Sequence, residues 1–263
     1  MSVSDPLAEQ HGDRILVRGH DLAELIPRLS FTEMLLLDLT GAVPPRAHVR
    51  LVDAVLVTIM EHGPTPSSLA ARLVLDGAPE SLQGAVAAGL LAVGSRFLGV
   101  IDEAASLLQR VVAGGGVEEE GLARAADREV GDLVRQGARV PGLGHNLHQR
   151  EDPRVSVLLA LAREQDVAGR HVQALEAVHR AARRHGKDLI VNAAGAVGAI
   201  LSDLGYPPDQ VRGFALVARC AGLFAHVVDE RRHPQARSLW EQASRQSAGA
   251  DRPQEDSRGH ATR

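Results

Sequence analysis

Apolar residues recur every three or four positions along most of the chain, the spacing that places them on one face of an α-helix. The clearest example is residues 45–61, where Val49, Val52 and Leu56 fall on such a face. Periodicity and helix-boundary residues predict further helices at residues 21–26, 34–39, 81–94, 117–135, 153–163, 169–185, 189–204 and 210–230. Residues 15–19 form a short strand-like run.

The ends of the chain lack this pattern. Residues 1–13 and 245–263 are polar and poor in apolar side chains, which predicts disordered tails.

The predicted helix at 81–94 has small residues at close spacing, which would let another helix pack tightly against it.

Composition narrows the class of protein. The chain has 263 residues, 44% of them hydrophobic but only 2% aromatic, so aliphatic side chains must fill the core, which favours closely packed helices. The net charge of -4 gives no reason to expect nucleic acid. A single cysteine suits a reducing compartment. We find no signal peptide and no apolar run long enough for a bilayer, so we expect a cytoplasmic protein with no membrane partner.

The stretch Pro141-Gly142-Leu143-Gly144-His145 carries candidate chemistry. Glycines on both sides of a residue permit an unusual backbone path and let main-chain N–H groups approach a ligand. A few residues later, Asp152-Pro153-Arg154 predicts a capped helix with an arginine in its first turn. The helix N-terminus and the guanidinium would together favour the binding of an anion. Taken alone, a glycine-proline turn before a capped helix is the simpler interpretation.

Two more polar side chains lie in unusual places. His62 stands at a proline-rich break after a helix, whereas a core histidine more often lies inside an element. Arg219 lies inside an apolar run, where it either pairs with Asp229 or Glu230 or binds an anion. The remaining clustered histidines (His171, His179 and His185) have no metal-ligand spacing, so we interpret them as surface residues and expect no metal site.

The P-G-x-G-H loop with its following D-P-R resembles the active-site loop of the citrate synthase superfamily. The resemblance is greatest to citryl-CoA lyases and to the citryl-CoA-cleaving module of ATP-citrate lyases. It extends over residues 14–242, and its motifs occur in the same order as in the family. The runs that carry it are "RGHDL…LSFTEMLLLDLTGAVP", "SLQGAVAAGLLAVG", "GSRFLG", "LIVNAAG" and "GFALVARCAGLFAHVVDE".

The resemblance implies an all-α fold with a large helical domain (14–104 and 212–244) and a smaller one (105–211). It implies a coenzyme A thioester as substrate and a homodimer or higher homo-oligomer built on residues 81–94. It also implies site roles. His145 would be catalytic, and Arg232 would serve the neighbouring subunit's site. The substrate-binding residues would be His62, Arg154, Arg219 and Arg232, and the cofactor-binding residues Pro141, Gly142 and Gly144.

Two positions depart from the family pattern. Phe97 stands where synthases have a catalytic histidine, and Ala194 stands where the family has the aspartate that acts at the acetyl carbon. We therefore expect a citryl-CoA lyase-like enzyme that cleaves citryl-CoA, or a related 3-hydroxyacyl-CoA, to acetyl-CoA and oxaloacetate. The main alternative is a non-catalytic or altered homologue that binds CoA esters or dicarboxylates. A condensing citrate synthase comes next, and a purely structural helical protein last.

Overall fold

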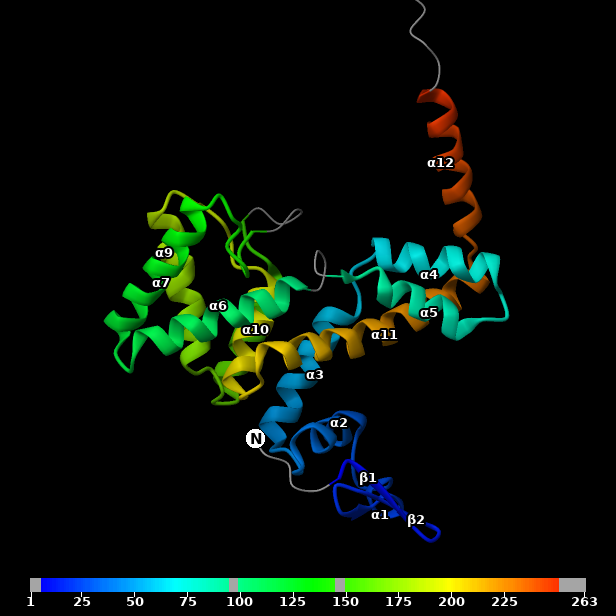
Figure 1. The fold of residues 1–263 in the computed structure, drawn as a ribbon, viewed down its shortest axis with the longest axis horizontal. Coiled ribbons are helices and arrows are strands. Elements are labelled where there is room, and N and C mark those ends of the chain that lie inside the picture. Colours follow the sequence, from blue (N-terminus) through cyan, green and yellow to red (C-terminus); the bar gives the residue numbers. More distant parts are fainter. Residues whose placement is uncertain (1–5, 95–98, 145–149, 251–263) are drawn as a thin grey trace, which may run out of the picture. The chain divides into compact units, whose positions relative to one another are not determined.

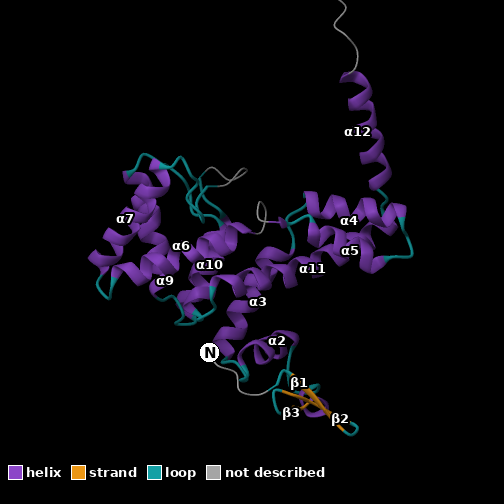
Figure 2. Ribbon diagram, viewed as in Figure 1, coloured by secondary structure: helices purple, strands orange, loops and turns teal. Residues whose placement is uncertain are grey.

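The computed structural model describes residues 6–94, 99–144 and 150–250. Within these ranges the chain is mostly helical, with one small sheet near the N-terminus (Figures 1 and 2), which confirms the all-α class. Contacts divide the chain into two units. Unit 1 consists of Met1–Glu61 and Gly94–Arg219, and unit 2 of His62–Val93 and Cys220–Arg263. These units do not follow the domain boundaries given above, which stay a prediction.

The sheet of unit 1 consists of three short antiparallel strands, β1 (Ala8–His11), β2 (Arg14–Val17) and β3 (His20–Asp21). Disorder was expected for residues 1–13, and for β1 this is wrong. All four β1 side chains are exposed, so backbone pairing in register with β2 holds this strand, and Gly12 turns the chain at a φ of 62°. A pattern of apolar positions cannot reveal such a strand.

Two helices follow the sheet, α1 (Leu22–Leu25) and α2 (Phe31–Thr40). A capping box between Ser30 and Glu33 opens α2, and Gly41 closes it at a φ of 76°. Buried side chains of β2, α1 and α2 form a small apolar cluster of Val17, Leu25 and Leu37.

Six more helices belong wholly to unit 1: α3 (Arg46–Met60), α6 (Gly99–Gly115), α7 (Glu119–Arg135), α8 (Pro153–Glu164), α9 (Arg170–Arg184) and α10 (Ala193–Asp203). The helix α10 packs on α6, α8 and α9 and also touches α3 (Figure 1). Residues 195–202 of α10 are all buried. At Gly198 an added Cβ would lie 3.0 Å from the backbone nitrogen of Ala105, so glycine allows α6 and α10 to approach closely. The core of unit 1 therefore fixes the position of α10.

Unit 2 contains α4 (Pro66–Gly77), α5 (Leu82–Leu91), α12 (Ala236–Ala250) and the C-terminal part of α11 (Pro208–Arg232). Its buried cluster joins Ala71 and Leu75 of α4, Ala85 of α5, and Leu223 and Val227 of α11. At Gly89 of α5 an added Cβ would lie 2.7 Å from Leu223, which confirms that the small residues of this helix permit close packing. The partner in the structure is α11 of the same chain.

A buried arginine on α4 ties three helices of unit 2 together. Arg72 donates from Nη1 to Glu230 (2.6 Å) and from Nη2 to Asp229 (2.7 Å), and its Nη2 lies 3.0 Å from Nδ1 of His226. The same Glu230 accepts the amide of Ala236 at 2.8 Å, at the start of α12. Disorder was expected from residue 245, but α12 continues to residue 250 because it is anchored in this way.

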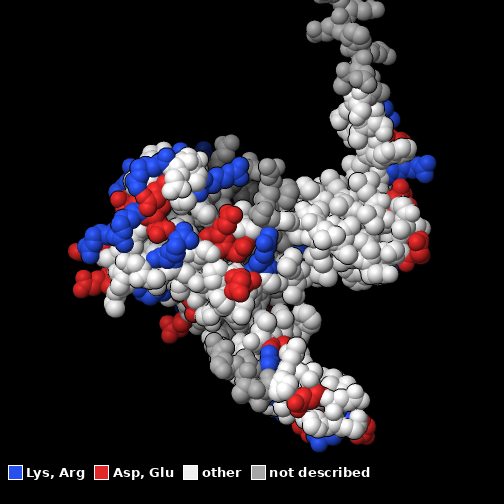
Figure 3. Space-filling view, in the orientation of Figure 1, with Lys and Arg blue, Asp and Glu red and all other residues white. Residues whose placement is uncertain are grey.

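Charged side chains are unevenly distributed in the two units. They crowd the visible face of α7 and α9, whereas the face over α4 and α5 is almost uncharged (Figure 3). On α12 the side chain of Trp240 is 60% exposed.

The helix α11 alone, among the described residues, is long and apolar enough to cross a membrane, with a mean hydropathy of 1.5 over its best window. No such run was expected from the sequence. The core helix of a folded protein passes the same test, and 44% of the window is buried. Its length and composition are therefore weak evidence for a membrane span.

Candidate functional site

The glycine-rich loop follows the unusual path that its sequence predicts. Gly142 and Gly144 have φ angles of 85° and 84°, in the left-handed region that favours glycine. A Cβ on Gly142 would lie 2.9 Å from Cα of Gly195, and one on Gly195 would lie 2.6 Å from the carbonyl oxygen of Gly142. The loop backbone therefore rests directly on the first turn of α10.

Hydrogen bonds join this loop to the segment before α10. The amide of Gly144 donates to Ile190 (2.7 Å) and the amide of Asn192 donates to Gly142 (3.0 Å). The Asn192 side chain donates from Nδ2 to Gly144 (2.7 Å) and accepts the amide of Gly195 (3.1 Å) as the cap of α10. A helix was expected from residue 189. It begins at Ala193 instead, because the preceding residues are extended to pair with the loop.

Arg154 lies in the first turn of α8, as predicted, but its guanidinium is paired. It donates from Nε to Oδ1 of Asp152 (2.9 Å) and from Nη2 to Oδ2 (2.8 Å). Asp152 is also the cap of α8 and accepts the amide of Arg154 at 3.1 Å. Its Oδ2 accepts a further amide, that of Ala193 on α10, at 3.1 Å.

Burial is the largest influence on the pKa of Asp152 and raises it, but the hydrogen bonds and charge of Arg154 and the Ala193 amide outweigh burial, so the pKa lies below its usual value. Asp152 is therefore an ionised acceptor at neutral pH. Its neighbour in space, the first turn of α10, carries Ala194 at a partly exposed position. The structure thus brings together the loop, Arg154 and position 194.

Arg219 is buried on α11, with 5% of the residue exposed. Its Nη1 donates to the carbonyl oxygen of Met60 at 3.1 Å. Burial lowers the pKa of its guanidinium, while the charge of Glu61 raises it, and the net shift is downward. The alternative pairing with Asp229 or Glu230 is wrong, because those two carboxylates bind Arg72.

His62 and Arg232 belong to unit 2. His62 is exposed in the break between α3 and α4, and Arg232 is exposed at the last position of α11. Their roles in binding a substrate stay predictions. His145, together with Phe97 and His148, lies outside the described residues.

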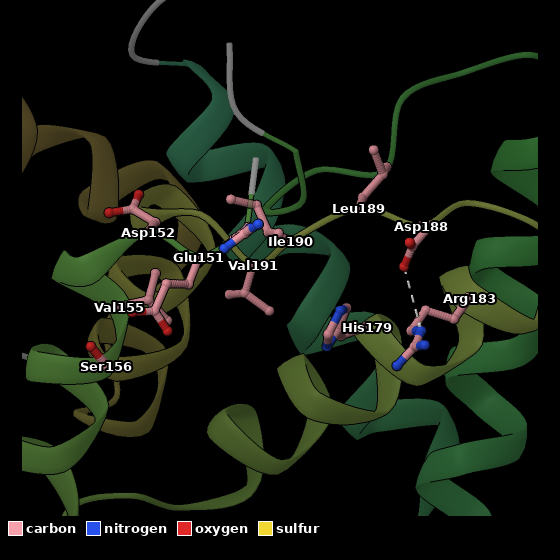
Figure 4. Close-up of a pocket in the computed structure, with 11 residues that line it drawn as sticks. Glu151, Asp152, Val155, Ser156, His179, Arg183, Asp188, Leu189, Ile190 and Val191 are labelled. Atoms are coloured by element: carbon pink, nitrogen blue, oxygen red, sulfur yellow. Dashed lines mark ion pairs between the residues drawn. The ribbon is translucent and has the colours of Figure 1, made fainter. Parts of the chain in front are cut away.

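Two hollows of unit 1 lie beside the loop. The first, of about 510 Å³, is shown in Figure 4. In this view Asp152 and Ser156 come from α8, and His179 and Arg183 come from α9, with Arg183 3.6 Å from Asp188. His179, interpreted above as a surface residue, is half-buried and lines this hollow.

The second hollow, of about 490 Å³, lies along the loop itself. Its lining includes Gly144 together with two cations, Arg139 and Lys187. An apolar Leu189 lines both hollows. A phosphate-bearing ligand would find positive charge and loop backbone here.

No group of three or more histidine, cysteine or acidic side chains could hold a metal ion in the described part of the chain. His171 serves another purpose, because its Nδ1 lies 2.8 Å from Oδ1 of Asp203. Asp203 also accepts the amides of Gly169, His171 and Val172 and so caps α9.

The profile of the citrate synthase C-terminal domain matches residues 9–240. The chain belongs to the citrate synthase family. Within this family it is similar to the citryl-CoA lyase of Hydrogenobacter thermophilus, at 29% identity and a TM-score of 0.79 over 99% of this chain and 94% of that one.

Larger family members match in part. The ATP citrate lyase of Methanothrix soehngenii, solved in complex with citrate and coenzyme A, shows 25% identity and a TM-score of 0.72 over 86% of this chain and 38% of its own. The ATP-citrate synthase beta chain protein 1 of Arabidopsis thaliana is 26% identical over 255 residues, again 86% and 38% of the two chains. The chain thus spans little more than a third of the curated relatives it matches.

Sequence reasoning missed the partners of Arg154. The aspartate before the proline is recognisable as a helix cap, and Arg154 lies only two residues from it, so their pairing is local. The bond of Asp152 to the amide of Ala193, in contrast, depends on the packing of α8 beside α10. The pairing of Arg72 was missed for the same reason, because 158 positions separate it from Glu230.

Proposed function

We propose that this chain is a carbon–carbon lyase of the citryl-CoA type, which cleaves citryl-CoA to acetyl-CoA and oxaloacetate, or a related 3-hydroxyacyl-CoA to an acyl-CoA and the corresponding carbonyl compound. The likeness to a citryl-CoA lyase over nearly the full length of both chains is the observation that carries this proposal. The paired Arg154, the buried Arg219 and the loop with its adjoining hollows support it, since they suit a carboxylate and a phosphate-bearing thioester.

In the proposed reaction a base takes the proton of the tertiary hydroxyl group. The bond between the carbinol carbon and the methylene carbon next to the thioester then breaks, which leaves the ketone of oxaloacetate. The electron pair passes to the thioester as an enolate, and protonation at carbon completes acetyl-CoA. The family resemblance gives the first step to His145 and the carboxylate contacts to His62, Arg154, Arg219 and Arg232.

The last step lacks its family residue, because position 194 is alanine. A well-placed acid or base contributes about 10²–10⁴ in rate. The enolate must therefore take its proton from water or from another side chain, and we expect slow turnover. Both oxygens of Asp152 are already engaged by Arg154 and by the amide of Ala193, so Asp152 is not a candidate for this role.

A second candidate function follows from the same position. A protein that keeps the carboxylate and thioester contacts but lacks the acid would bind citryl-CoA or its parts without cleaving them. Ala194, partly exposed at the first turn of α10, favours this alternative.

One pair of measurements separates the two. Calorimetric titration with citrate and with coenzyme A tests binding, and release of oxaloacetate from citryl-CoA tests cleavage. Turnover that is lost in His145→Ala supports the lyase, and binding without turnover supports the second candidate. Neither binding nor turnover would contradict both.

We also propose that the active assembly is at least a homodimer. The helix α5 contains no charged residue, and it leaves Leu91 85% exposed, while α11 leaves Phe224 50% exposed. Apolar area of this kind is favourably removed from water by a second copy of the chain.

A further inference from the structure

One carboxylate in unit 1 bonds to two different helices. Asp152 is 2% exposed, and each of its two carboxylate oxygens accepts two hydrogen bonds. Oδ1 accepts the amide and Nε of Arg154, at 3.1 and 2.9 Å. Oδ2 accepts Nη2 of Arg154 at 2.8 Å and the amide of Ala193 at 3.1 Å. The side chain therefore connects the guanidinium on α8 to the first turn of α10 (Asp152 is labelled in Figure 4).

These contacts fix the arginine in a defined plane. Bonding through Nε and Nη2 is a two-point attachment, which sets the orientation of the guanidinium as well as its distance. A long side chain that is ordered before a ligand arrives loses less conformational freedom on binding. The other end of the bridge is equally fixed, because Asn192, the cap of α10, is bonded to the loop at Gly144.

We propose that Asp152 is a positioning residue for the reaction: it holds the carboxylate-binding Arg154 in a fixed geometry against the first turn of α10, where position 194 faces the substrate. The inference rests on the proposed function, in which Arg154 binds a substrate carboxylate. Asp152 itself touches no reacting atom. It acts by ordering Arg154 and α10 as one rigid unit before the substrate binds.

A purely structural role makes a different prediction. If Asp152 only caps α8, asparagine should replace it with little loss, because asparagine is an equally good helix cap. If Asp152 only neutralises Arg154, its removal should tighten the binding of an anion. Only a positioning role predicts that citrate binds more weakly to a folded Asp152→Asn variant.

The decisive experiment compares Asp152→Asn with a matched variant, Asp203→Asn. Asp203 of unit 1 also has a buried side chain, which is 5% exposed, and it caps α9 through the amides of Gly169, His171 and Val172. Affinity for citrate is measured by calorimetry and exchange of the Ala193 amide by NMR. We expect Asp152→Asn to weaken citrate about 3- to 10-fold, the equivalent of ordering one long side chain on binding, and to speed exchange at Ala193. Asp203→Asn should leave both unchanged.

In cleavage assays the positioning role also raises KM for citryl-CoA in Asp152→Asn more than in Asp203→Asn. Unchanged or tighter citrate binding in a folded Asp152→Asn protein would overturn the inference, as would equal weakening in both variants. If Asp152→Asn does not fold, Asp152→Ser keeps a capping side chain. In addition, citrate added to the wild type should slow exchange at Ala193, and no change there would count against the coupling.

A failure of the proposed function would give a different experimental result from a failure of the positioning role. A wild-type protein that binds neither citrate nor coenzyme A would contradict the lyase and the binding protein alike. The rigid connection is still decided in that case, because unchanged exchange at Ala193 and an unaltered Nε–H resonance of Arg154 in Asp152→Asn would overturn it.

Discussion

At the scale of single residues, position 194 separates the two candidate functions. Ala194 lies in the first turn of α10, one residue after the amide that Asp152 accepts. It is partly exposed, so a larger side chain can be accommodated there.

We predict that Ala194→Asp raises the rate of citryl-CoA cleavage, by up to about 10²–10⁴ if the new carboxylate reaches the enolate carbon. The gain can be smaller, because residues that act as a unit are not additive. Ala194→Asn has nearly the same shape without the acid and is the control. Equal rates in both variants and in wild type, with all three folded, would rule out position 194 as the reason for slow turnover.

Arg219 is a second residue at which the proposed function can be tested. We predict that Arg219→Leu weakens citrate binding by about 1.5–3 kcal/mol, the range for a hydrogen bond to a charged group. The control is Arg212→Leu on the same helix, where the arginine is half-buried and lies 3.9 Å from Asp102. Calorimetry on both variants checks the prediction, and unchanged affinity in Arg219→Leu removes this residue from the site.

Much of this detail was predictable where it depends on local sequence. The two loop glycines and the aspartate-proline cap of α8 have the conformations that their residue types favour. What the sequence could not reveal is pairing over distance. Asp229 and Glu230 were candidate partners of Arg219, yet on the folded helix they face Arg72 of α4 instead.

At the scale of elements, the loop and α10 behave as one structure, since main chain touches main chain at Gly142 and Gly195. We predict that Gly142→Ala lowers the free energy of unfolding by more than the about 1–3 kcal/mol expected for a left-handed residue alone, because its Cβ also meets α10. The control, Gly137→Ala, has a similar φ of 66° but open space around the Cβ. Equal losses in urea unfolding would show that the close contact is unimportant.

The ion pairs of Arg72 make unit 2 sensitive to acid. The hydrogen bond from Arg72, followed by that from His233, lowers the pKa of Asp229 from its usual 3.8 to about 2. A lowered pKa contributes stability that is complete above about pH 4 and is lost as the pH falls towards 2. We predict that Asp229→Asn loses this part of the pH dependence.

Urea unfolding of wild type and Asp229→Asn between pH 2 and 6 tests this. The two curves should differ above pH 4 and converge at low pH. Asp76→Asn, at an exposed position of α4 in the same unit, is the control. A constant difference between wild type and Asp229→Asn at every pH would contradict the assignment.

Most elements follow from apolar periodicity, because each helix has a face to bury. Two helices that do bury an apolar face, α4 and α6, were nevertheless not predicted. The other exceptions are elements that other forces hold. β1 has no buried side chain, and α12 is held mainly at its first turn by Glu230, so neither has the pattern that sequence analysis detects. At residues 189–192 the reverse applies, because an apolar run that resembles a helix is extended by pairing with the loop.

At the scale of the whole molecule, the uncharged surface of α5 is the feature on which the proposed homodimer rests. We predict a homodimer at micromolar concentration by sedimentation velocity, and dissociation to monomers in Leu91→Glu, because a charge would be buried without a counterion. Val117→Glu is the matched control, since Val117 is 92% exposed but lies in unit 1. A monomeric wild type, or equal effects of both substitutions, would contradict this interface.

The exposed Trp240 on α12 has a practical consequence. It is the only tryptophan in the sequence, and Tyr206 is the only tyrosine. Light at 295 nm therefore excites a single indole, which belongs to unit 2, whereas the loop and α10 belong to unit 1. The emission maximum of Trp240 should lie at a longer wavelength in any state that leaves α12 in water. It should shift to a shorter wavelength when another surface covers that helix. Intrinsic fluorescence will therefore report on α12 and its contacts, and the unfolding of unit 1 needs a different probe.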